Sequence, residues 1–201
     1  MKLAEFKNKR IAILWFWKEG QSSLRFLLEQ GVQDLTVLDK SDIVEQHDNV
    51  KYVTGENYLD NLSDFDIILK SPGISPFLEK LLPYREKFVS QTQIFFENYT
   101  GKVIGITWTK GKSTLSTLLY ECLEFAGYDV KLVWNIWSPV LDEIDFNWVV
   151  HDYVIYELSS YMLQDFSPKL EIWVLNNIYP CHLDWHFDSY NIYREAKVNI
   201  L

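Results

Sequence analysis

The chain has 201 residues, a net charge of −9 and 48% hydrophobic residues. This length fits one large domain or two small ones, and the apolar share excludes intrinsic disorder. The acidic balance argues against a general nucleic-acid binder, two cysteines are too few for a disulfide scaffold, and no apolar run approaches the roughly 18 residues that span a bilayer. We therefore expect a cytoplasmic monomer with no nucleic-acid or membrane partner.

Short apolar stretches alternate with helical stretches along the chain. The first part is predicted to hold one helix at 22–30, ended by Gly31, and strands at 10–14, 35–39, 51–53 and 66–70. The second part is predicted to hold helices at 93–99 and 115–125 and strands at 103–107, 129–133, 153–157 and 172–175. This alternation predicts an α/β fold with parallel, doubly wound sheets. The last residues, 196–201, lie in a predicted helix, so we expect the front part of a longer protein.

The strongest chemical signal is Thr109-Lys110-Gly111-Lys112-Ser113-Thr114, between a predicted strand and a predicted helix. In a phosphate-binding loop, backbone N–H groups at a helix N-terminus hold phosphate oxygens, a lysine neutralises them and a hydroxyl ligates Mg²⁺. Lys112 and Ser113 stand where this chemistry requires them. The long form of the motif would need glycine at Ile106, and a shorter form would need it at Trp108. A chance turn rich in lysine and serine is the alternative interpretation.

The first predicted strand is followed by Trp15-Phe16-Trp17-Lys18-Glu19-Gly20, where a Rossmann-like fold has a glycine-rich turn. Asp39 ends the next predicted strand about 20 residues later, as in dinucleotide-binding folds. Two indoles occupy places where backbone must approach a ligand closely. On this turn alone, an aromatic surface cluster is the slightly better interpretation.

Two further segments carry candidate metal-ligating side chains just after predicted strands. Glu157 ends one strand, and His182 follows another; a carboxylate beside a phosphate loop suits Mg²⁺. Taken singly, Glu157 and Lys197 fit solvated charges and His182 fits a structural histidine. Cys181-His182 lacks the second pair of ligands that a zinc site needs.

Together these segments resemble the Mur ligase family over nearly the whole chain. The loop at 105–114 resembles the family's ATP loop, 156–163 its Mg²⁺-binding glutamate segment, and 177–184 the segment whose histidine completes the metal site. Cys181 departs from the family pattern, which usually has aspartate there. The resemblance implies an α/β protein with a Rossmann-like, UDP-substrate-binding N-terminal domain at 1–92 and a truncated P-loop ATPase-type central domain at 93–201.

The resemblance also implies roles for individual residues. The implied catalytic residues are Lys112, His182 and Lys197, the last as a carbamylated lysine. The implied metal ligands are Ser113, Glu157 and His182. The implied ATP-binding residues are Trp108, Thr109, Lys110, Gly111, Lys112, Ser113 and Thr114. The implied substrate-binding residues are Trp15, Phe16, Trp17, Asp39, Ser71, Pro72, Gly73, Asn135 and Ser159.

The implied activity is that of the family members that add D-glutamate to UDP-N-acetylmuramoyl-L-alanine with ATP and Mg²⁺, through an acyl phosphate, in peptidoglycan precursor synthesis. The family's third domain is missing, so residues 1–201 alone are expected to be inactive. The alternatives are a Mur ligase that adds a different residue and a non-catalytic nucleotide-binding module, which the tryptophan-blocked loops favour.

The composition is unusual in one respect: glycine and tryptophan each number 8 of 201, whereas glycine alone usually makes up about 7% of residues. Five tryptophans fall where the family pattern has glycine: Trp15, Trp17, Trp108, Trp134 and Trp137. Trp148 and Trp173 are further candidates, whereas Trp185 fits the pattern as tryptophan. One cause explains all five, namely a genetic code that reads UGA as glycine and is translated here as tryptophan.

Overall fold

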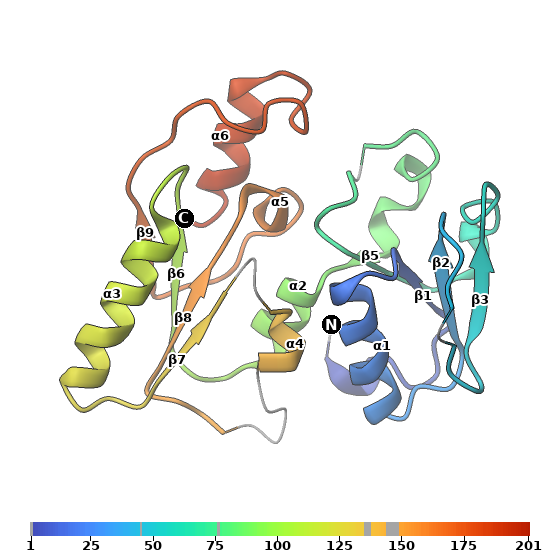
Figure 1. Ribbon diagram of the computed structural model, residues 1–201, viewed down its shortest axis with the longest axis horizontal. Coiled ribbons are helices and arrows are strands. Elements are labelled where there is room, and N and C mark those ends of the chain that lie inside the picture. The colour runs from blue at the N-terminus through green and yellow to red at the C-terminus, as the bar shows by residue number, and fades with distance from the viewer. Residues whose placement is uncertain (1, 45, 76, 135–137, 144–148) are drawn as a thin grey trace. The chain divides into compact units, whose positions relative to one another are not determined.

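The computed structural model describes residues 2–44, 46–75, 77–134, 138–143 and 149–201. The chain divides into two compact units, Met1–Asn98 and Tyr99–Leu201 (Figure 1). The expected boundary between residues 92 and 93 lies inside helix α2 (Gln91–Asn98), which belongs wholly to the first unit.

The first unit is built on a five-stranded parallel sheet in the order β3-β2-β1-β4-β5. Its strands are β1 (Ile11–Leu14), β2 (Leu35–Asp39), β3 (Lys51–Thr54), β4 (Ile67–Lys70) and β5 (Phe88–Val89). Residues of β1, β2 and β4 are buried without alternation, as expected for parallel strands that are covered on both faces. The strand order reverses between β1 and β4, and ligands of open parallel sheets bind at such a point, beyond the carboxyl ends of the strands.

Helix α1 (Lys18–Glu29) follows β1 and starts four residues earlier than predicted, because the turn residues Lys18 to Gln21 already form its first turn. Gly31, with φ +75°, follows the helix as predicted; the left-handed conformation there is easy for glycine. The described residues of this unit also form short 3₁₀ segments at Leu3–Glu5, Leu62–Asp64 and Leu82–Lys87. They and β5 carry no sequence periodicity and are not among the predicted elements.

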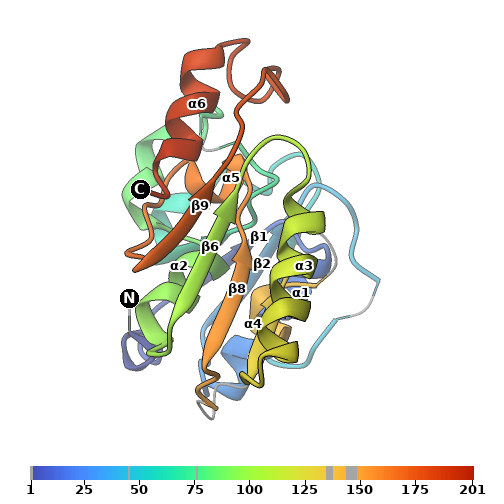
Figure 2. The ribbon, with the colours of Figure 1, turned by 90° about the vertical axis from the view of Figure 1, so that its left-hand side faces the viewer.

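The second unit has a four-stranded parallel sheet in the order β7-β8-β6-β9. Its strands are β6 (Val103–Thr107), β7 (Val130–Val133), β8 (Tyr153–Glu157) and β9 (Ile172–Leu175), and its helices are α3 (Lys112–Phe125), α4 (Val140–Glu143), α5 (Ser160–Leu163) and α6 (Tyr190–Val198). Figure 2 shows β9, β6 and β8 side by side, with α3 running along them. The predicted α/β class with parallel sheets is therefore confirmed in both units.

Two helix ends in this unit differ from the prediction. Helix α3 begins at Lys112, three residues early, because the phosphate-loop candidate itself forms the first turn. Helix α6 ends at Val198 and is capped by Asn199, whereas the sequence predicted that it would continue to the last residue. Among the described residues, no helix is long and apolar enough to cross a bilayer.

Candidate active site

The phosphate-loop candidate lies between β6 and α3, at the carboxyl edge of the second sheet. Gly111 precedes the first residue of α3 and has φ +94°, a left-handed conformation that residues with a Cβ rarely adopt. The first N–H groups of α3 therefore emerge from a glycine turn at the positive end of the helix dipole. Lys112 Nζ donates to the carbonyl of Trp108 at 3.1 Å, so the lysine lies folded over the loop.

Glu157 lies against this loop. In the sheet it pairs with Ile106, next to the strand that leads into the loop, and the Ser113 hydroxyl donates to its Oε2 at 2.9 Å. Its side chain is almost fully buried, and Oε1 has no hydrogen-bond partner among the described residues. A buried acidic oxygen without a partner is costly, so this position can accept a cation or a donor from a ligand.

Lys197, on α6, approaches the same loop from the other side. It is 2% exposed, and its Nζ donates to Thr107 Oγ1 at 3.1 Å and to the Trp108 carbonyl at 3.0 Å. Two lysines, Lys112 and Lys197, thus converge on one carbonyl oxygen. Burial, reinforced by the nearby charge of Lys112, lowers the pKa of Lys197 from 10.5 to about 7. A large share of Lys197 is therefore neutral near physiological pH.

His182 is placed differently. It is exposed, has φ +51°, and its ring lies 5.6 Å from the ring of Tyr161. We expected it to meet Glu157 near Ser113 because all three follow strands of one sheet. However, β9 ends at Leu175, so the strand fixes the position of Asn176 rather than that of His182. Within the described part of the chain, no group of three or more His, Cys, Asp and Glu residues could hold a metal ion. The metal role of His182 stays a prediction.

Trp108 lies under the loop. It is 3% exposed and packs in an apolar cluster with Ile104, Ile106 and Ile155. Its Nε1–H is buried without a hydrogen-bond partner among the described residues, and Nε1 would lie 3.6 Å from a Cβ placed on Gly111. The indole also lines an open pocket of about 530 Å³ together with Lys110, Gly111, Thr114, Leu115, Leu118, Val174, Leu175 and Asn176.

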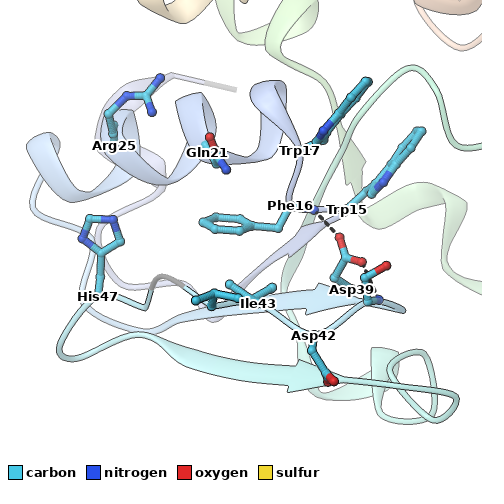
Figure 3. Close-up of a pocket in the computed structure, with 11 residues that line it drawn as sticks. Trp15, Phe16, Trp17, Gln21, Arg25, Asp39, Asp42, Ile43 and His47 are labelled. Carbon is cyan, nitrogen blue, oxygen red and sulfur yellow. Dashed lines mark hydrogen bonds between the residues drawn. The ribbon is translucent and has the colours of Figure 1, made fainter.

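The first unit has a separate pocket of about 710 Å³ beyond the carboxyl end of β1. Figure 3 shows the ring of Phe16 between Gln21 of α1 and Ile43, with Arg25 of α1 and His47 to one side of it. Arg25, Gln21 and His47 are suited to bind a polar or anionic ligand, and the ring of Phe16 offers a flat apolar face.

Asp39 joins two turns at the edge of this pocket. Its Oδ2 accepts the backbone N–H of Phe16 at 2.7 Å and its Oδ1 accepts that of Ser41 at 2.8 Å. Both carboxylate oxygens of Asp39 thus accept backbone N–H groups. Asp39 therefore shapes the pocket wall by fixing the two turns that contain Phe16 and Ser41. A direct contact of Asp39 with substrate stays a prediction.

Trp15 is strained. Its φ is +76°, in the region that favours glycine, and a Cβ on Gly73 would clash with its ring. The predicted substrate loops Trp15–Trp17 and Ser71–Gly73 therefore meet beyond β1 and β4, at the switch point of the sheet. Trp17 is 70% exposed and stacks on Trp15 with ring centroids 6.5 Å apart.

The other predicted site residues take various positions. Ser159 is buried and caps α5 by accepting the N–H of Met162 at 3.3 Å. Lys110 and Thr114 are exposed on the phosphate-loop candidate, and Pro72 lies between Ser71 and Gly73 after β4. Asn135 and Trp137 lie outside the described residues.

Comparison with known proteins gives two kinds of match. No protein-family model matches the chain. The chain is 33% identical to the UDP-N-acetylmuramoylalanine–D-glutamate ligase of Acetivibrio thermocellus over 98% of this chain and 44% of that protein. It is 35% identical to the ligase of the same name from Clostridium beijerinckii over 98% of this chain and 45% of that protein. The chain thus spans less than half the length of the curated relatives that it matches.

Among solved structures, a UDP-N-acetylmuramate:L-alanyl-gamma-D-glutamyl-meso-diaminopimelate ligase from Neisseria meningitides has a similar fold. The TM-score is 0.53 at 16% identity, over 96% of this chain and 67% of that chain. The chain is a homologue of the Mur ligases. The resemblance predicted from its motifs is confirmed, and its fold is that of a Mur ligase structure.

The residues of this Mur ligase homologue fit a divalent cation beside the phosphate loop. Mg²⁺ prefers oxygen ligands, and the Ser113 hydroxyl and the unpartnered Oε1 of Glu157 are oxygens 44 residues apart in the chain that the fold brings together. The residues of the phosphate-loop candidate fit ATP only in part, since the loop has the required glycine turn at Gly111 but a buried indole at Trp108.

Three residues of the Mur ligase homologue were not among the predicted site residues. Tyr193 contacts the phosphate loop through Thr109, and His186 is fully buried with its Nε2 3.1 Å from Ser160 Oγ. Burial raises the pKa of Glu19, in the first turn of α1, to about 8, although the charge of Lys70 partly offsets this rise. Sequence spacing gives no signal for the first two, whose contacts are tertiary. Glu19 could have been noted as an acidic residue in a turn expected to meet an anionic ligand.

Proposed function

We propose that the chain is part of an ATP- and Mg²⁺-dependent ligase that adds D-glutamate to UDP-N-acetylmuramoyl-L-alanine in peptidoglycan precursor synthesis. The observation that supports this most is the identity of 33–35% to D-glutamate ligases over 98% of the chain. The contact between Ser113 and Glu157 at the start of α3 adds a local reason, because it pairs a phosphate loop with a cation ligand.

In this proposal the substrate's carboxylate attacks the γ-phosphorus of ATP, ADP leaves, and an acyl phosphate forms. The D-glutamate amine then attacks the acyl carbon, phosphate leaves, the nitrogen releases a proton, and an amide results. Lys112 and the N–H groups of α3 would bind the transferring phosphate, and Ser113, Glu157 and His182 would hold Mg²⁺. Bound Mg²⁺ neutralises phosphate charge as it develops.

In the first unit, the switch-point loops and Asp39 would hold the UDP part of the substrate, with Phe16 and Ser71–Gly73 lining it. Arg25 and His47 are additional candidates because they line the pocket beyond β1 together with Phe16 and Asp39. Residues 1–201 alone are expected to form no amide, since they match less than half of each relative.

The proposed function predicts a specific amine. We define the glycine form as the full gene product with Trp15→Gly, Trp17→Gly, Trp108→Gly, Trp134→Gly and Trp137→Gly. With ATP, Mg²⁺ and UDP-N-acetylmuramoyl-L-alanine, D-glutamate should accelerate ADP release at least about 100-fold over L-glutamate, because a site built to bind the polar groups of one isomer leaves them unpaired with the other. Coupled ADP assays measure this. Equal rates with another amino acid would assign a different Mur ligase activity, and no ATP turnover would favour the non-catalytic module.

Lys197 supports a second, chemical prediction. A neutral amine can attack CO₂ to form a carbamate with loss of a proton, and the lowered pKa makes Lys197 largely neutral at pH 8. Because protonation competes with this reaction, carbamate should decrease as the pH falls from 8 to 6. With ¹³C-bicarbonate, the wild-type chain should show a carbamate resonance by NMR that Lys197→Ala removes. Lys169→Ala, at an exposed lysine, should retain it; a resonance unchanged by Lys197→Ala would contradict the carbamate role.

A further inference from the structure

Tyr193 connects three parts of the second unit. Its side chain is 1% exposed, its hydroxyl lies 2.8 Å from Thr109 Oγ1, and its ring lies 5.3 Å from Lys197 Nζ. The same ring forms a T-shaped pair with the ring of His186, with centroids 5.3 Å apart and an interplanar angle of 70°. Tyr193 and Lys197 are one turn apart on α6, so they present neighbouring groups to the phosphate loop.

The two α6 side chains contact three consecutive residues of the chain. Lys197 contacts Thr107 and Trp108, and Tyr193 contacts Thr109. This is the segment by which β6 leads into the phosphate loop. A movement of α6 relative to β6 would therefore break both the hydrogen bonds of Lys197 and the contact of Tyr193 with Thr109.

The Thr109 hydroxyl lies between Tyr179 and Tyr193. Its Oγ1 accepts the N–H of Tyr179 at 2.9 Å, and it lies 3.2 Å from the Tyr179 carbonyl and 2.8 Å from the Tyr193 hydroxyl. A hydroxyl has one proton and two lone pairs. When the Thr109 proton goes to the Tyr179 carbonyl, Tyr193 is the donor to Thr109; when it goes to Tyr193, Thr109 is the donor, and the two hydroxyls are hydrogen-bonded in both cases.

We propose that Tyr193 is a positioning residue of the nucleotide site: its hydroxyl anchors the phosphate loop through Thr109 while its ring supports Lys197. This inference rests on the proposed function, because it assumes that the loop binds a nucleotide. A loop that is already held in its binding conformation loses less conformational freedom when the nucleotide binds. If the loop also samples other conformations, the apparent affinity falls in proportion to the fraction of molecules in the binding conformation. Tyr193 thus acts through Thr109 and Lys197 rather than on the nucleotide.

The test is Tyr193→Phe in the glycine form, with Mg²⁺–ATP affinity measured by calorimetry. This change removes only the hydroxyl and leaves the ring over Lys197. We expect the dissociation constant to rise about fivefold, as for the loss of one net hydrogen bond. In a Thr109→Val background, Tyr193→Phe should have no further effect on affinity, because the hydroxyls act as a pair.

Tyr190→Phe is the matched control. Tyr190 lies on the same helix, and its hydroxyl donates to the carbonyl of Ile178 at 2.9 Å, outside the phosphate loop. Tyr190→Phe should change the dissociation constant for Mg²⁺–ATP by less than about twofold relative to the parent glycine form, the range expected of a substitution away from the site. The inference would be overturned if Tyr193→Phe left the affinity for Mg²⁺–ATP unchanged. It would also be overturned if Tyr193→Phe lowered the affinity equally in the parent and in the Thr109→Val background. If the parent glycine form binds no Mg²⁺–ATP, the proposed function fails and this inference fails with it.

Discussion

Lys112→Ala should lower the rate of D-glutamate-dependent ADP release by the glycine form about 100- to 1,000-fold, because removal of one preorganised group that stabilises developing charge costs about 10²–10³ in rate. Lys112 is the first residue of α3, beside the only left-handed glycine that leads into a described helix of the second unit. In the structure its Nζ is held on the Trp108 carbonyl at 3.1 Å, within the loop that would receive the phosphates. Coupled assays at saturating substrate give this rate.

The control for Lys112→Ala is Lys102→Ala. Lys102 precedes β6 at the opposite end of the strand, and its Nζ lies 5.4 Å from the ring centroid of Tyr153. Loss of this exposed lysine should change the rate by less than about twofold, since its contact with Tyr153 lies at the opposite end of β6 from the phosphate loop. Undiminished turnover by Lys112→Ala would remove the basis for the ATP-loop assignment.

The sequence predicted the strands better than the helices, and the reason is physical. β2, β6, β8 and β9 have the expected bounds. β2, β6 and β8 are largely buried parallel strands, which read as apolar runs. β9 is an apolar run as well, although Ile172 and Trp173 are exposed. Helix starts were predicted late because Lys18 and Lys112 lie in turns with no apolar periodicity, although they already have helical hydrogen bonding. The short elements β5, α4 and α5 contain too few residues for any period to be recognised.

The candidate site was predictable where a residue lies at a strand end or a helix start. Glu157 and Ser113 were expected beside each other and do meet, because parallel strands bring their carboxyl ends to one edge. His182 lies seven residues beyond β9, and the strand rule has no force at that distance. The roles of Tyr193 and the buried state of Lys197 depend on how α6 packs on the loop, which no local pattern encodes.

The last prediction is that Trp15, Trp17, Trp108, Trp134 and Trp137 are encoded by UGA and made as glycine, with UGG encoding Trp185. The structure supports this most strongly at Trp15, which has a left-handed φ of +76° and a ring packed onto Gly73. Trp108 and Trp17 do not have a positive φ; that of Trp17 is −89°. The Trp108 indole N–H is buried without a partner among the described residues, which costs about 1–3 kcal/mol. The indole N–H of Trp185 is buried without a partner too, so this feature does not distinguish Trp108 from a genuine tryptophan.

Sequencing the gene tests the codons, and mass spectrometry of the native protein tests the residues. Stability gives an independent check. Trp15→Gly should stabilise the chain or leave its unfolding free energy unchanged, because it relieves backbone strain of about 1–3 kcal/mol. Trp185→Gly should destabilise it by about 3–5 kcal/mol, since Trp185 packs edge-on against Tyr161 at 4.8 Å. Urea denaturation of the two variants measures both.

The same hypothesis predicts a large difference in binding. The glycine form should bind Mg²⁺–ATP at least about 100-fold more tightly than the tryptophan form, because backbone N–H groups can approach phosphate only where no side chain intervenes. The UGA hypothesis would be wrong if the five positions have UGG codons and if the glycine form binds Mg²⁺–ATP as weakly as the same full-length protein with tryptophan at these positions. Those two results would make the buried indole of Trp108 a native part of the loop, and the non-catalytic module would then be the better account of this chain.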